Sequence, residues 1–172
     1  MVRFMWDELT IETSVELDTS DLDQANSLAS LDYFSDALRD TLDDITKDIT
    51  ERSETLGEKL SQRAKSLQEL MIGLNGTIGH GDLLNSITVE GNGENSYLVG
   101  TNITHFYPLV VEKGRTAVEP VSAPFLQWQN LDGSWVRTKY SRPFAGKPYV
   151  EPSYNHLTSE LDGIIDEVFG GL

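Results

Sequence analysis

Apolar residues recur at steps of three and four over about forty positions of this chain, and this long helical periodicity limits the fold more than any other feature. The stripe runs through Leu31, Phe34, Leu38, Leu42, Ile45, Ile49, Leu56, Leu60, Ala64, Leu67 and Met71. At ~1.5 Å per residue such a helix would be roughly 60 Å long, more than a domain of this size needs. Either the helix breaks between Glu51 and Gly57, where the stripe lapses, or part of it projects to meet another subunit.

The helical region is predicted to span residues 20–71. Ser20 with Asp23, or Asp21 with Gln24, has the spacing of a helix cap. Glycines from 73 to 81 end the helix, and they predict a flexible connection because no GxxxxGK[ST] pattern for binding phosphate is present. The helix also carries an acidic run, which indicates a solvated face rather than a cation site, because a helix spreads its carboxylates along its axis. The run consists of Asp40, Asp43, Asp44, Asp48 and Glu51.

A first strand is predicted at residues 9–17, where LTIETSVEL alternates apolar and polar residues with a period of two. Residues 82–115 then predict a central hairpin and a signature turn. One strand begins at Leu84 and includes Ile87 and Val89, the second contains Tyr97 and Val99, and residues 91–95 supply the Gly/Asn turn. The segment after Thr104 is predicted to form a buried turn against the sheet.

Residues 116–147 predict an inserted loop with a hairpin from Phe125 to Tyr140, turning at Asp132-Gly133. The second arm and exit of this hairpin carry four basic residues, and no acid lies between Trp135 and Val150. Aromatic and basic residues together suit an interface hot spot. We therefore expect a subunit or partner interface here, although DNA contact or a simple exposed hairpin is also open. The candidate residues are Trp135, Arg137, Lys139 and Arg142.

A final helix is predicted at residues 153–169, with Ser153 as its N-cap and with Leu157, Leu161, Ile164, Ile165, Val168 and Phe169 on one face. Together these elements predict a single α+β domain over residues 1–172. An antiparallel sheet would be packed by a long N-terminal helix and a C-terminal helix, with the hairpin inserted.

The order of several short motifs resembles a known family. The chain contains, in this order, GDLLNSI, VGTN, HFYPLVVEKGR and, before the final helix, Lys147-Pro148-Tyr149-Val150-Glu151-Pro152. This ordered set resembles the tail-completion or head-to-tail joining proteins of long-tailed bacteriophages and related archaeal viruses. The resemblance implies that Tyr107, Pro108, Glu112 and Gly114 are signature positions. Arg115 stands where the family commonly has threonine. On local chemistry alone, Pro108 and Gly114 could simply shape a turn, and Glu112 could cap it or pair with Arg115.

The resemblance implies a structural role in the virion, and the host cytoplasm as the site of assembly. Copies would form a cyclic homo-oligomer, sixfold or twelvefold, in the neck between the portal-side connector and the tail terminator or tube. Packaged DNA would pass nearby without specific binding, along a lumen that we expect to be lined by acids. Alternatives are a tail terminator, a minor capsid protein, or, in a different class, a soluble acidic adaptor that binds a basic peptide along a sheet edge.

Charge and composition narrow the possible classes of function and partner further. The net charge is -15, and the first 54 residues hold 15 acidic and 4 basic residues against 13 and 9 in the rest. The negative electrostatic potential of such a chain disfavours duplex DNA or an anionic membrane as the main partner, because both are themselves negatively charged. No segment approaches the ~20 apolar residues of a membrane span. With no cysteine and with His80, His105 and His156 lacking metal-ligand spacing, we expect no metal, no cofactor and no catalysis.

Overall fold

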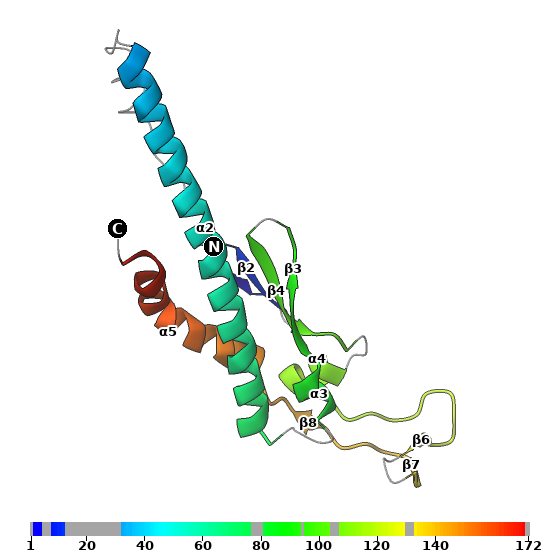
Figure 1. Ribbon diagram of the computed structural model, residues 1–172. Helices are drawn as coiled ribbons and strands as arrows, with labels where there is room; N and C mark the ends of the chain where they lie inside the picture. Colours follow the sequence, from blue (N-terminus) through cyan, green and yellow to red (C-terminus); the bar gives the residue numbers. More distant parts are fainter. Residues whose placement is uncertain are drawn as a thin grey trace.

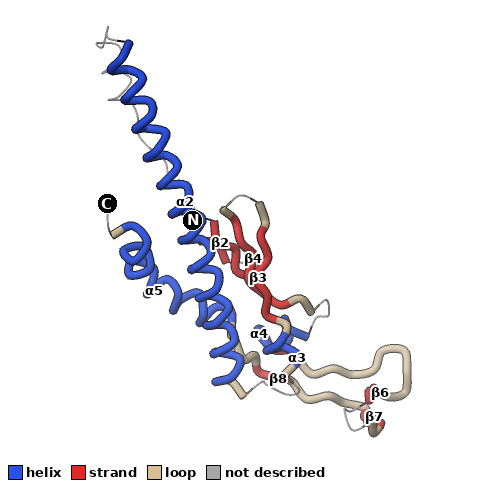
Figure 2. The backbone as a smooth tube through the Cα atoms, viewed as in Figure 1, coloured by secondary structure: helices blue, strands red, loops and turns tan. Residues whose placement is uncertain are grey.

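The computed structural model describes residues 2–4, 8–12, 32–76, 81–93, 95–103, 107–129 and 133–170. A long helix, α2, forms the axis of the molecule, with a second helix, α5, along one side and a small sheet on the other (Figure 1). A ribbon of chain extends away from the lower end of this body, as the tube in Figure 2 shows. The fold is α+β with the predicted components: an antiparallel sheet, a long helix, a C-terminal helix and an inserted hairpin.

Helix α2 is continuous from Asp32 to Leu74. Its 43 residues make it about 64 Å long. Of the two predicted alternatives the break near Gly57 is wrong, because α2 is continuous there and Ser53 and Gly57 lie on its buried side. Tertiary packing therefore offsets the ~1 kcal/mol by which glycine disfavours a helix interior. The caps predicted at Ser20 and Asp21 lie outside the described residues.

The four-stranded sheet is antiparallel throughout and has the order β1-β2-β4-β3. Its strands are β1 (Val2–Phe4), β2 (Glu8–Glu12), β3 (Ile87–Gly91) and β4 (Ser96–Thr101). Strand β2 pairs with β4 so that Ile11 lies opposite Tyr97, and the first predicted strand and the central hairpin therefore belong to one antiparallel sheet. Residues 13–17 of that predicted strand lie outside the described residues. Strand β1 was not predicted, because three residues are too few to show a period.

The central hairpin turns as expected but begins differently. Gly93 and Asn95 have φ angles of 115° and 54°, the left-handed region that Gly and Asn tolerate. The strand predicted to begin at Leu84 instead begins at Ile87, since Asp82–Asn85 forms a short helix, α3. Ser86 ends this helix by donating a hydrogen bond from Oγ to the Leu83 carbonyl at 2.7 Å. Burial of Leu83 holds the turn in place.

Residues 114–145, which we call the arm, form the inserted ribbon. It follows α4 (Tyr107–Lys113), a helix where the sequence predicted a turn. Strands β5 (Gly114–Arg115) and β8 (Phe144–Ala145) pair at the root of the arm, and Val118 pairs with Ser141 further out. The predicted hairpin is confirmed at the tip as β6 (Leu126–Gln129) and β7 (Trp135–Thr138). Asp132 of its turn lies outside the described residues.

Helix α5 (Val150–Phe169) runs antiparallel to α2. Arg52 and Lys59 of α2 contact the last turns of α5, whereas Asn75, just after α2, contacts Pro148 before α5 begins. Ser153 is not the N-cap as predicted. The helix begins three residues earlier with Tyr149 at the N-cap position, and the Ser153 hydroxyl donates to the Tyr149 carbonyl at 2.5 Å.

Two clusters of buried side chains form the core. The upper cluster joins α2, α5 and the sheet through Ile11, Leu56, Leu60, Ala64, Leu67, Val99 and Leu157. The lower cluster joins the ends of α2, α3, α4 and α5 through Ile72, Leu83, Ile87, Val111, Tyr149 and Val150. The arm starts beside this lower cluster. None of the described helices is long and apolar enough to cross a membrane.

Candidate functional site

The root of the arm is built on two glycines that let the backbone segments touch. Gly114 has a φ of 78°, and a Cβ there would lie 2.5 Å from the Gly146 nitrogen and the Phe144 carbonyl oxygen. A Cβ on Gly146 would lie 2.7 Å from the Glu112 carbonyl oxygen. Real side chains do not fit at such distances, so the outgoing and returning strands of the arm require glycine at both positions.

Glu112 fastens this root to the core. Its side chain is buried at 4% exposure, and its carboxylate accepts backbone hydrogen bonds from Tyr149 at 2.7 Å, Val150 at 3.1 Å and Glu151 at 3.4 Å. These N–H groups lie at the start of α5. The first N–H groups of a helix have no carbonyl acceptor within the helix, and the helix dipole favours an anion there. Glu112 therefore caps α5 from 37 residues away. The sequence singled out Glu112 but not this partner.

The predicted alternative, in which Glu112 pairs with Arg115, is wrong. The guanidinium of Arg115 points along the arm instead, where Nη2 donates to the Ser141 hydroxyl at 2.5 Å and Nη1 to the Thr116 carbonyl at 3.3 Å. Arg115 thus joins the two strands of the arm just beyond the root.

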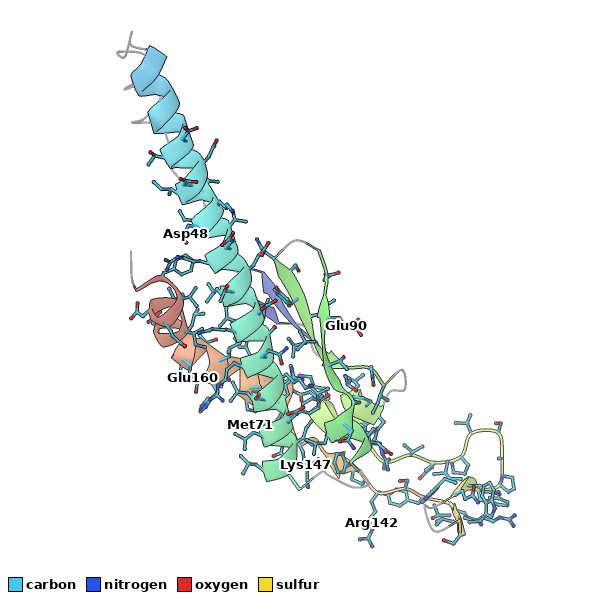
Figure 3. All side chains as sticks on the ribbon, viewed as in Figure 1. Asp48, Met71, Glu90, Arg142, Lys147 and Glu160 are labelled. Atoms are coloured by element: carbon cyan, nitrogen blue, oxygen red, sulfur yellow. The ribbon has the colours of Figure 1, made fainter. Side chains whose placement is uncertain are left out.

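Lys147 and Asn75 make a second tie between the arm and the helices. Lys147 Nζ donates to the Asn75 carbonyl at 2.7 Å, and Asn75 Nδ2 donates to the Pro148 carbonyl at 2.8 Å. The Lys147 backbone nitrogen also donates to the Val111 carbonyl at 2.7 Å. An ammonium group at the C-terminal end of α2 is favoured by the helix dipole. Lys147 is therefore an anchor, and in Figure 3 it lies at the lower end of α2 while Arg142 extends away from the body.

The tip of the arm presents aromatic and basic side chains to solvent. Trp135 is 61% exposed, Tyr140 48% and Trp128 42%. On β7, Trp135 and Arg137 alternate with the half-buried Val136, and Lys139 continues the exposed side beyond the strand. The Arg137 guanidinium lies 5.0 Å from the centre of the Phe125 ring, a cation–π contact across the ribbon.

The predicted site residues thus separate into three places. Pro108, Glu112 and Gly114 lie at the root. Pro108 is buried in the first turn of α4. Trp135, Arg137 and Lys139 lie at the tip of the arm, whereas Arg142 lies near the root, between β8 and the Val118–Ser141 pair and close to Arg115. Tyr107 is exposed at the start of α4. The structure brings the root residues together in one anchor and leaves the basic and aromatic residues on the surface.

The other end of the molecule carries the opposite charge. Helix α2 extends past the C-terminal end of α5, which reaches back as far as Asp48 and Arg52 (Figure 1). Residues 32–47 make up the part of α2 before Asp48, and we call them the projecting segment. Within it Asp40, Asp43 and Asp44 are exposed, and no described side chain forms an ion pair with them. Ile45 is also 43% exposed.

An open groove between α2 and α5 is occupied by ion pairs. Arg63 holds Glu160 with two hydrogen bonds of 2.7 and 2.6 Å, and Lys59 holds Glu167 at 2.6 Å. Hydrogen bonds from the Arg63 guanidinium lower the pKa of Glu160, and His156 lies 3.4 Å from the same carboxylate. Because its cations are already neutralised, the groove is poorly suited to bind an anion.

The described residues contain no group of three side chains that could hold a metal ion. Of the three histidines, His156 lies on the exposed face of α5, while His80 and His105 lie outside the described residues. The described geometry therefore offers binding surfaces, with one aromatic and basic surface at the arm tip and one acidic surface on the projecting segment.

Comparisons of the chain with protein-family models, curated protein sequences and solved structures found no significant match. The resemblance to tail-completion proteins accordingly rests on the ordered motifs of the sequence.

Proposed function

We propose that this chain is a structural subunit of a tailed virion, and that copies of it form a ring in the neck that joins the head connector to the tail. The arm is the observation that carries the proposal. It places Trp128, Trp135 and Tyr140 in solvent, although large aromatic side chains contribute most when they are buried. An isolated two-stranded ribbon is at best marginally stable in water. A partner that covers the tip would account for both features.

The anchor supports the same proposal. Glu112, Gly114, Gly146 and Lys147 fix the direction of the arm relative to the three helices that meet at its root. A surface that binds by shape needs such preorganisation, since ordering a loose segment on binding costs affinity. Head-to-tail contacts that repeat with a rotation close into rings. Acidic side chains that face the lumen outside the contacts between copies would let DNA pass through the ring without adhering.

Two measurements test the function. Sedimentation velocity and electron microscopy of the purified chain should show discrete closed rings, and quantitative mass spectrometry of purified virions should find the chain in fixed stoichiometry with the tail. A ring whose uncovered acids lie on the outer wall would contradict the role given to the acidic lumen. A stable monomer that never enters virions would contradict the neck role, and it would favour an adaptor that binds a basic peptide beside β3, the last strand in the order of the described sheet.

A further inference from the structure

We propose that the tip of the arm binds the projecting segment of α2 in a second copy of this chain. The inference rests on the proposed ring but goes further, because it names the two surfaces that join neighbouring copies. The arm surface consists of Trp135, Arg137 and Lys139, and its receptor consists of Asp40, Asp44 and Ile45.

The contact has to form between copies. The projecting segment and the arm leave the body at opposite ends, the segment beyond the C-terminus of α5 and the arm below the end of α2 (Figure 1). An arm therefore cannot reach the projecting segment of its own chain. Two different surfaces at opposite ends make the contact heterologous, the kind that propagates from copy to copy.

Charge favours a receptor whose carboxylates are not already paired with cations. The arm tip is basic, and its cations are exposed. Several other acidic side chains on the described helices are already paired with cations, as Glu160 is with Arg63, Glu167 with Lys59, Asp48 with Arg52 and Glu69 with Lys65. Asp40 and Asp44 form no ion pair with any described side chain, so an arriving arm displaces no described partner.

The spacing of the two surfaces also agrees. Asp40 and Asp44 are one helical turn apart, about 6.0 Å along the axis at ~1.5 Å per residue. Arg137 and Lys139 are two residues apart on an extended chain, about 6.8 Å at ~3.4 Å per residue. One alignment therefore pairs Lys139 with Asp40 and Arg137 with Asp44. Ile45 is the next residue after Asp44 and lies on an adjacent side of the helix, so the agreement in spacing concerns the two charges.

Cross-linking tests the contact directly, because the chain has no cysteine and each introduced thiol is unique. We expect Asp44→Cys and Lys139→Cys proteins to form a disulfide-linked dimer only when mixed. Combining both substitutions in one chain should produce a ladder that ends at the ring size. Lys139→Cys mixed with Ser159→Cys, whose thiol lies on exposed α5, is the matched control and should not link. Linking in Asp44→Cys alone, equal linking to Ser159→Cys, or no linking in the mixture overturns the inference.

Charge exchange separates this inference from the proposed function. Asp40→Lys with Asp44→Lys, or Arg137→Glu with Lys139→Glu, should abolish assembly at low salt, and the chain with all four changes should regain it. Lys65→Glu, which changes the charge elsewhere on α2, should assemble normally. If rings and virions form regardless of these exchanges, the inference fails and the neck role stands. If the exchange restores assembly but the chain never enters virions, the inference stands and the neck role fails.

Discussion

The carboxylate of Glu112 accepts a 2.7 Å hydrogen bond from the backbone nitrogen of Tyr149, and this contact closes the base of the arm. Residues 114–145 leave and return between these two positions. One buried side chain therefore both caps α5 and fixes the root of the surface that we propose for assembly.

Replacing Glu112 should destabilise the fold strongly. Glu112→Ala leaves three N–H groups at the start of α5 without their acceptor, and we expect a loss of about 2–3 kcal/mol in the free energy of unfolding. Glu112→Gln keeps one acceptor and should lose about half as much. Urea unfolding followed by circular dichroism measures both. Glu119→Ala, an exposed acid on the arm, is the control, and equal effects at the two positions would contradict the capping role.

Replacing glycine by alanine should have opposite effects on stability at Gly114 and at Gly163. Gly114→Ala should cost about 3 kcal/mol or more, because it adds a Cβ at positive φ against neighbouring backbone atoms. Gly163→Ala, inside α5 with no atom within 4 Å of the added Cβ, should instead stabilise by roughly 0.5–1 kcal/mol. Thermal unfolding of both variants tests the difference. A neutral Gly114→Ala would mean that the strands at the arm root do not pack as closely as described.

Shortening the arm should separate folding from assembly. Replacing residues 116–143 by a short glycine-serine turn keeps the β5 and β8 root and removes the exposed tip. Since the arm lies outside both core clusters, the free energy of unfolding should change by no more than about 1 kcal/mol. The midpoint of urea unfolding measures this change. Sedimentation should show loss of assembly. A shortened chain that unfolds, or that still forms rings, would contradict the division of roles.

The ion pair between Arg63 and Glu160 should make stability depend on pH. The pKa of Glu160 is lowered in the folded chain, so its stabilising effect is present above its ordinary pKa of 4.5 and is lost as the pH falls through the lowered value. Glu160→Gln should therefore reduce Tm at pH 7 and leave it unchanged in strong acid. Calorimetry at both pH values checks this. Glu90→Gln on β3 is the control, and an equal loss of Tm at both pH values would assign the effect to packing.

Local patterns predicted most elements of the fold correctly. The three- and four-residue stripe predicted α2, because a buried helix face requires that spacing whatever lies against it. Alternation predicted β2, β4 and the tip hairpin in the same way. The failures occurred where long-range packing competes with local preference. Gly57 does not break α2 because it is buried, and Leu84 does not begin a strand because burial of Leu83 favours α3.

For the candidate site, the sequence identified part of the residues, missed Asn75 and Gly146, and left the role of each residue to the tertiary structure. The resemblance of the ordered motifs singled out Glu112 and Gly114, and the clustering of basic and aromatic residues singled out the hairpin. The role of Glu112 depends on α5 returning to it, a contact across 37 residues that no local pattern encodes. The separation of Lys147, bound to the end of α2, from the exposed Arg137 and Lys139 likewise depends on where the helices end. Periodicity is a property of neighbouring residues, whereas the partner of a buried charge is set by the packing of distant segments.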